Sequence, residues 1–310
     1  MITKPMDVLS CYPVRKNKKQ KAAFRDEVQS YVESLGYVCE TEKGSLGAQN
    51  LVIGDPKSAK YLVTAHYDTP PQLPIPNFIT PCNFGIYLLY QFAIVAIFIV
   101  AAIIPGVILG VLLDNPEISS IVSMVVYWGL LIMLIAGPAN KHNANDNTSG
   151  IVTVLETARN LPVEYRDQVC FVLFDLEEAG LIGSSSYRKL HKKESNQQIV
   201  LNCDCVGDGN EMVLFPTKKL KKNTAMMHAL LQAETKTEKK TVCVHRNGFS
   251  FYPSDQMNFP YGVGISAFRR KKLIGIYCDK IHTRKDTILE EENVIILSRQ
   301  LMKILCGSAQ

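Results

Sequence analysis

Histidine and carboxylate side chains follow several apolar runs of this 310-residue chain, and these residue types can bind metal ions. The side chains that stand out are His66, Asp68, Asp146, Glu177, Glu178, Asp204 and His282. In open α/β sheets, ligands bind beyond the carboxyl ends of the strands, so we expect these side chains to gather at one edge. Imidazole nitrogens and carboxylate oxygens suit divalent zinc, cobalt or manganese. The sequence therefore predicts a metal centre.

The spacing within each run adds detail to this prediction. His66 and Asp68 are two residues apart, so on a strand they face the same side, and Asp68 can accept the second ring N–H of His66. Asp146 lies in a polar loop before a predicted helix, where its carboxylate could bridge two ions. Alone, each feature is weak, because a single strand histidine is usually structural. We interpret Cys203 and Cys205, on either side of Asp204, as packing residues.

Strands and helices alternate around these residues, which predicts an α/β fold with a mostly parallel central sheet and helices on both faces. Apolar runs bounded by turn residues predict strands at 50–54, 61–68, 169–178, 199–205, 264–268 and 273–277. Amphipathic spacing predicts helices at 18–35, 148–160, 184–193, 223–235 and 289–305.

Residues 84–137 interrupt this pattern with a dense apolar block. About 20 apolar residues are enough to cross a bilayer core, and the block holds two such runs joined by the turn DNPEISS. We expect a transmembrane helical hairpin at 84–137 that contacts the lipid bilayer, with a kink or an end of the membrane part at Pro105. The alternative is a pair of buried core helices in a soluble protein. In the interpretation with a transmembrane hairpin, residues 1–80 and 140–310 form one discontinuous catalytic domain.

Composition excludes several classes of protein. The net charge is only +5, and the basic clusters at 15–21, 218–222 and 269–272 have few interleaved aromatic residues, so we interpret them as solvated faces and expect no nucleic acid partner. The nine cysteines are odd in number and scattered, which predicts free thiols in a reducing compartment. The N-terminal residues contain no apolar stretch typical of a cleavable signal peptide.

Six short motifs carry a resemblance to a known family: AHYDT at 65–69, NDNTSG at 145–150, FDLEEAGLIGSSSY at 174–187, NCDCVG at 202–207, PSDQMNF at 253–259 and IHTRKDT at 281–287. In these motifs and their order the chain resembles metallopeptidase family twenty-eight, the co-catalytic zinc aminopeptidases and their relatives. The resemblance covers roughly residues 10–80 and 140–305. It implies a zinc exopeptidase-like fold and a metal-dependent exopeptidase, most commonly an aminopeptidase, that hydrolyses peptides with two zinc ions, or with cobalt or manganese.

The resemblance also implies a role for each residue. His66 and Asp204 would bind one ion, Glu178 and His282 the other, and Asp146 both; Asp68 would support His66, and Glu177 would be the general base that takes a proton from the attacking water. The chain departs from the family pattern at Ile281, where several members carry a tyrosine that stabilises the oxyanion, and at Gln256, where histidine is frequent.

Two other interpretations stay open. Glutaminyl cyclases share this fold but perform acyl transfer with one zinc ion; they would not need His66, and its presence beside Asp68 disfavours this interpretation. A catalytically inactive membrane-bound homologue would usually lose ligands, and all five expected ligands are present here.

The position of the apolar block predicts a topology. It lies between His66 and Asp146, which belong to one predicted site, so its two ends must be close together and the catalytic domain must lie on one side of the membrane. The turn DNPEISS carries two acidic residues and no basic one, whereas Lys141 and the basic N-terminal segment lie on the domain side. The positive-inside rule then predicts a cytoplasmic catalytic domain.

Overall fold

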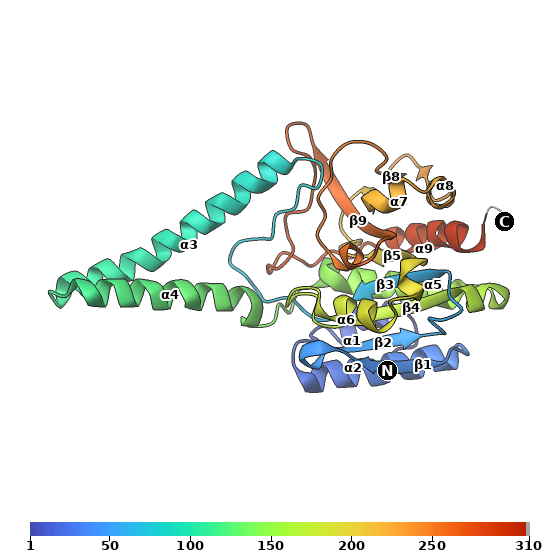
Figure 1. Ribbon diagram of the computed structural model, residues 1–310, viewed down its shortest axis with the longest axis horizontal. Coiled ribbons are helices and arrows are strands. Elements are labelled where there is room, and N and C mark those ends of the chain that lie inside the picture. The colour runs from blue at the N-terminus through green and yellow to red at the C-terminus, as the bar shows by residue number, and fades with distance from the viewer. Residues whose placement is uncertain (308–310) are drawn as a thin grey trace.

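A mixed sheet with helices on both faces forms the body of the protein, and a long helical hairpin projects from it (Figure 1). The structure is a computed structural model that describes residues 1–307, so residues 308–310 of the predicted catalytic domain lie outside the described residues. Ten strands of the described chain join the sheet in the order β1-β2-β4-β3-β5-β9-β6-β8-β7, with β10 paired to β9. Their bounds are β1 (Cys39–Lys43), β2 (Gln49–Ile53), β3 (Tyr61–His66), β4 (Val169–Phe174), β5 (Ile199–Cys203), β6 (Glu211–Pro216), β7 (Thr235–Lys236), β8 (Thr241–Val244), β9 (Gly262–Lys271) and β10 (Gly275–Tyr277).

The centre of the sheet is parallel, as predicted, and its flanks are mixed. Strands β4, β3, β5 and β9 run parallel to one another. Antiparallel pairs flank them, β1 with β2 and β2 with β4 on one side and β6 with β9 on the other. The α/β class is therefore confirmed, and the carboxyl ends of β3, β4 and β5 lead into predicted site residues.

Alternating side chains of the central strands belong to two hydrophobic cores, one on each face of the sheet. On one face Val63 and Ala65 of β3 join a core that includes residues of α2 (Lys18–Ser34), α5 (Gly150–Asn160) and α9 (Glu291–Cys306). On the other face Leu62 packs with Tyr187 of α6 (Ile182–Leu190). Every residue of β3 is buried, as expected for a central strand covered on both faces. The remaining helices of the body are α1 (Asp7–Cys11), α7 (Lys218–Lys221) and α8 (Thr224–Leu231).

The prediction of a solvated basic face at 15–21 was wrong for two of its residues. The Arg15 side chain is fully buried and donates hydrogen bonds to the carbonyl oxygens of Tyr67 and Tyr12. Lys21 is buried and paired with Asp175. A buried cation is tolerated when hydrogen-bond acceptors surround it, and charge counting along the sequence does not reveal such acceptors.

The apolar block forms two helices, α3 (Phe84–Leu112) and α4 (Pro116–Ala136), that leave the body as a hairpin (Figure 1). Both are long and apolar enough to cross a membrane, judged by length and composition. In their most apolar windows only 11% of α3 and none of α4 is buried, so they are not core helices of the described chain. Helix α3 continues through Pro105 to Leu112, so the helix itself does not end at this proline.

Small residues allow the two helices to approach closely. Ala102, Gly106 and Gly110 are buried one turn apart on α3. A Cβ atom on Gly106 would lie 2.0 Å from the Ser123 Oγ atom, and one on Gly110 would lie 2.6 Å from the Ser119 Cβ atom. Small residues at this spacing are typical of packed helices within membranes.

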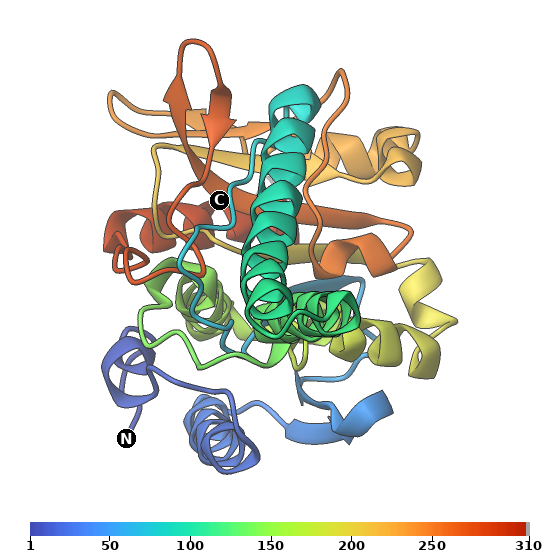
Figure 2. The ribbon, with the colours of Figure 1, turned by 90° about the vertical axis from the view of Figure 1, so that its left-hand side faces the viewer.

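The chain segments that lead into and out of the hairpin region lie side by side at residues 70–72 and 138–140, before α3 begins and after α4 ends. Pro71 and Ala139 form an antiparallel bridge. The amide of Gln72 donates to the carbonyl oxygen of Pro138 over 2.7 Å, and the amide of Asn140 donates to that of Pro70 over 2.8 Å. Figure 2, in which the hairpin points towards the viewer, shows α3 running upward in front of the sheet and α4 nearly end-on.

Candidate metal centre

The structure brings the predicted ligands together at the carboxyl ends of the parallel strands. His66 is the last residue of β3, and Asp204 directly follows the neighbouring β5. Asp146 lies in the turn of residues 144–149 that leads into α5. Ligand atoms of His66, Asp146 and Asp204 lie within 4.8 Å of one another, and so do those of Asp146, Glu178 and His282.

Asp146 belongs to both groups through different oxygen atoms. Its Oδ1 atom lies 3.3 Å from the Nε2 atom of His66, and its Oδ2 atom lies 3.1 Å from the Nε2 atom of His282. The first group is completed by Asp204, whose Oδ1 atom is 3.6 Å from the same His66 nitrogen. The second is completed by Glu178, whose Oε2 atom is 3.4 Å from the His282 nitrogen. One carboxylate therefore faces two separate groups of donors.

These separations fit metal coordination. Two ligand atoms that are each about 2.0 Å from a tetrahedral zinc ion lie about 3.3 Å apart. In addition, Oε1 of Glu178 and Oδ1 of Asp204 are buried without a hydrogen-bond partner among the described residues. Because a buried carboxylate oxygen without a donor is costly, each is satisfied when a cation lies beside it.

Asp68 connects the histidine to the glutamate pair. Its Oδ1 atom lies 3.5 Å from Nδ1 of His66, as expected for a residue that orients this ring. The same carboxylate accepts the backbone amide of Glu177 over 3.0 Å and that of Glu178 over 3.3 Å. Asp68 thus fixes the glutamate loop as well as the histidine, which the spacing argument did not reveal.

The glutamates do not close a strand, contrary to the prediction for 169–178. Strand β4 ends at Phe174, and Leu176 has a φ of 56°, so the chain turns before Glu177. The continuous apolar pattern of VCFVLFDL hid this turn, because a hydrophobic Leu176 reads as a strand residue.

The protonation of the site follows from burial and crowded carboxylates. Burial raises the pKa of Glu177 well above its ordinary value, and the neighbouring Glu178 and Asp255 raise it further against the effect of His66. Burial also raises the pKa of Glu178, to which Asp146 adds. Burial lowers the pKa of His66, but Glu177, Asp146 and Asp204 outweigh it and raise this pKa well above the usual range. Such a group of carboxylates strongly attracts positive charge.

Asp286 supports the site but was not singled out from the sequence. Its Oδ1 atom accepts the amide of Asn145 over 2.8 Å, and its Oδ2 atom accepts the amide of Asp146 over 3.0 Å. The side-chain oxygen of Asn145 in turn accepts the amide of Gly207 over 2.7 Å. Asp286 therefore anchors the turn that presents Asp146. The sequence feature that could have identified Asp286 is its position four residues after His282 in the motif IHTRKDT.

Asp255 is a second residue that sequence reasoning left without a role. It is fully buried, and neither carboxylate oxygen has a hydrogen-bond partner among the described residues. Burial raises its pKa to about 7. The sequence feature that could have identified Asp255 is the motif PSDQMNF, which places an acidic residue between apolar segments. Ile281 is buried in a hydrophobic cluster.

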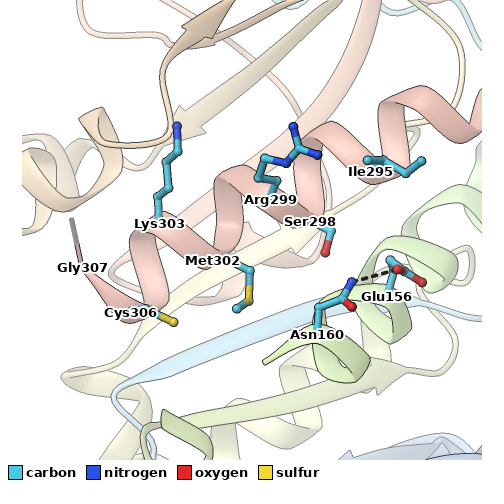
Figure 3. Close-up of a pocket in the computed structure, with 9 residues that line it drawn as sticks. All are labelled: Glu156, Asn160, Ile295, Ser298, Arg299, Met302, Lys303, Cys306 and Gly307. Carbon is cyan, nitrogen blue, oxygen red and sulfur yellow. Dashed lines mark hydrogen bonds between the residues drawn. The ribbon is translucent and has the colours of Figure 1, made fainter. Parts of the chain in front are cut away.

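A separate pocket lies between α5 and α9 (Figure 3). Asn160, at the end of α5, lines it, whereas the metal centre lies at the start of that helix, so the pocket is at the opposite end. The carboxylate of Glu156 in this pocket accepts a hydrogen bond from Asn160 over 2.8 Å. No histidine is among the described residues that line it, and we assign it no catalytic role.

Comparison with known proteins agrees with this fold. The structure is similar to a zinc-dependent exopeptidase from Parabacteroides distasonis, with a TM-score of 0.59 and 14% identity over 98% of this chain and 96% of that one. It is also similar to the Porphyromonas gingivalis glutaminyl cyclase, with a TM-score of 0.57 and 15% identity over 99% and 96% of the two chains. The Legionella pneumophila LapA aminopeptidase gives a TM-score of 0.58 and 15% identity over 97% and 69%. No curated protein sequence matches the chain significantly.

The fold and the donor set define a zinc exopeptidase-like protein of α/β class. The sequence profile of peptidase family M28 matches residues 129–296. The chain belongs to peptidase family M28. The matched range includes Asp146, Glu177, Glu178, Asp204 and His282, whereas His66 and Asp68 precede it.

Proposed function

We propose that the protein is a membrane-bound aminopeptidase that uses two zinc ions to hydrolyse the N-terminal residue of peptides. The observation that carries this proposal is the carboxylate of Asp146, whose two oxygens face His66 and His282 separately. With Asp204 beside one histidine and Glu178 beside the other, the residues supply two places for a cation.

Each ligand residue has a proposed role in holding one or both ions. His66, Asp146 and Asp204 would hold one ion, and Asp146, Glu178 and His282 the other. Zinc ions in such a site lower the pKa of water and polarise the peptide carbonyl group.

Glu177 is the candidate general base. It lies within the group formed with His66 and Glu178. Asp68 accepts a hydrogen bond from the backbone amide of Glu177, which holds the backbone of Glu177 at the site. A carboxylate with a raised pKa can take the proton of the attacking water and pass it to the leaving amine. Burial supplies that raised pKa here.

The hairpin supports the membrane part of the proposal. Most of the large apolar side chains on α3 and α4 are exposed, including Val111 at 75% and Leu112 at 72%. An apolar surface of this extent is unfavourable in water and favourable in lipid. The lipid bilayer would therefore surround α3 and α4, and the metal centre would lie close to the base of the hairpin.

A substrate panel tests the function. The protein, purified in detergent, is assayed with zinc, cobalt or manganese against aminoacyl anilides, dipeptides, N-blocked peptides and a peptide that begins with glutamine, and its bound metal is counted. Release of free N-terminal residues by protein with two ions supports the proposal. Cyclisation of the glutamine peptide with one ion would instead identify a glutaminyl cyclase, and absence of both metal and turnover would identify an inactive homologue.

A further inference from the structure

A small apolar pocket lies at the base of the hairpin and touches the metal centre. Its volume is about 230 Å³. His282 lines it and also belongs to the group formed by Asp146 and Glu178. The other walls come from the segment 73–77, from α3 and from Leu134 of α4. The pocket is therefore shared between the catalytic body and the hairpin.

The wall from the body is rigid and is fixed to the histidine loop. The amide of Leu73 donates to the carbonyl oxygen of His282 over 2.7 Å, and the amide of Asn77 donates to that of Ile281 over 3.2 Å. Pro74 and Pro76 restrict the backbone between these two anchors. This wall is thus preformed at a fixed position relative to His282.

The wall from the hairpin is one face of α3. Tyr90, Gln91, Ile94 and Phe98 follow one another at helical spacing and line the pocket. The hydroxyl group of Tyr90 donates to the carbonyl oxygen of Pro76, and its ring lies 5.2 Å from that of Phe78. These contacts fix α3 against the body, so its pocket residues have a defined distance to the site.

Gln91 is informative because of its type. Apart from two tyrosines, it is the only polar side chain in helix α3, and it lies in this pocket. Polar residues within apolar membrane helices usually have a functional role. Its amide group can bond to a peptide backbone, while Ile94, Phe98, Leu73 and Leu134 surround an apolar group.

We propose that this pocket binds the bulky apolar side chain of the substrate residue next to the cleaved bond, and that α3 sets this specificity. The inference rests on the proposed peptidase function. No Asp, Glu, Lys or Arg is among the described residues that line the pocket, so a charged side chain would have no partner there. Pockets for whole drug-sized ligands span about 300–1,000 Å³, so this smaller pocket fits one side chain and not an entire peptide.

Paired variants of α3 test the inference. Ile94→Phe fills the pocket, and Ile97→Phe makes the same change on the same helix at a side chain that is 48% exposed. The activities kcat/KM are measured with leucine, phenylalanine and alanine 4-nitroanilides, with the protein in lipid nanodiscs. We expect Ile94→Phe to reduce the leucine-to-alanine ratio by about tenfold, since a misfit of one or two methylenes changes selectivity by about 10–200-fold. We expect Ile97→Phe to keep the ratio within twofold.

A second pair of α3 variants keeps the inference testable if Ile94→Phe does not fold. Phe98→Ala enlarges the pocket, whereas Phe92→Ala removes a ring that is 68% exposed. Phe98→Ala should raise the activity with a tryptophan substrate several-fold relative to leucine, and Phe92→Ala should not. Unchanged ratios in both pocket variants of an active enzyme would overturn the inference but leave the peptidase function intact. An equal fall in the leucine-to-alanine ratio with Ile94→Phe and Ile97→Phe would also overturn the inference, because the effect would then not depend on the pocket. If no aminoacyl substrate is cleaved by the unmodified protein, the proposed function itself fails.

Discussion

The carboxylate of Asp146 lies between two histidines that come from distant parts of the chain. Each of its oxygens faces a different imidazole nitrogen, at 3.3 Å for His66 and 3.1 Å for His282. Its own position is set by Asp286, which accepts the backbone amide of Asp146. In the proposed two-ion site, a residue with this arrangement would couple both positions, so changes at Asp146 should affect both together.

Substitution of this carboxylate is the first prediction. Asp146→Asn should lower the bound metal at both positions, because a neutral amide is a poor bridge between two cations. His66→Ala should remove mainly one ion, because His66 lies beside Asp204 and does not belong to the group that Asp146 and Glu178 form with His282. Elemental analysis of the purified variants measures both effects. Loss of a single ion from Asp146→Asn would contradict the bridging role.

The second prediction concerns the base. Glu177→Gln keeps the shape of the side chain but cannot accept a proton, so turnover should fall by at least about 10²-fold. Metal content should stay unchanged. The matched control is Glu178→Gln, which should lose metal because Glu178 faces His282. The opposite pattern of metal loss would reverse the roles of the two glutamates.

Much of this site could be predicted from residue types and order. Histidine and carboxylate at the ends of predicted strands indicated where His66 and Asp204 would meet, because neighbouring parallel strands end at one edge. Asp286 and Arg15 were missed, because their importance comes from hydrogen bonds to backbone groups far along the chain. The length of an apolar run does not show where a strand turns, which explains the error at β4.

At the scale of elements, the hairpin depends on the close approach of α3 and α4. Gly106 and Gly110 lie at the contact, against Ser119 and Ser123 of α4. The backbone of α3 remains helical through Pro105. The apolar pattern predicted both helices and their approximate ends, but it did not predict the contact between them. That contact depends on the rotation of each helix about its axis, which a uniformly apolar sequence does not define.

The third prediction tests this contact. Gly106→Ala should destabilise the hairpin by about 1–3 kcal/mol, the usual cost of overpacking, because its Cβ atom would lie 2.5 Å from the carbonyl oxygen of Ser119. Gly129→Ala is the matched control, since a Cβ atom there has nothing within 4 Å. The midpoint of thermal unfolding in detergent compares the two variants. An equal midpoint for both would show that the helices pack through another face.

At the scale of the whole molecule, the body lies to one side of the hairpin. The turn between α3 and α4 is the part of the hairpin most distant from the sheet in Figure 1. Lys16 donates a hydrogen bond to the carbonyl oxygen of Ile135 over 3.0 Å, so a positive charge lies at the base of α4. Asp114 and Glu117 lie at the opposite end. From this distribution and the positive-inside rule we propose a cytoplasmic body.

Thiol labelling tests the orientation and is the fourth prediction. Cys11, Cys82, Cys243 and Cys306 are first replaced, because the other five cysteines are buried. In intact cells, a membrane-impermeant reagent should label Glu117→Cys in the turn and should not label Asn196→Cys, which is exposed on the body. Lysis should make Asn196→Cys reactive. Labelling of Asn196→Cys before lysis would reverse the orientation, and recovery of all protein without detergent would contradict the membrane location.

The bridge between Pro71 and Ala139 also has a consequence for folding. Closing a chain loop costs entropy that grows with its length, and His66 and Asp146 are separated by the whole hairpin segment. The contacts between α3 and α4 join neighbouring parts of the chain, so they form without a long loop closure. Once these helices have paired, the chain between Pro71 and Ala139 already folds back on itself, and the connections from Pro71 to α3 and from α4 to Ala139 remain to be closed. Pairing of α3 and α4 therefore lowers the entropy cost of bringing together the parts of the catalytic domain before and after the hairpin.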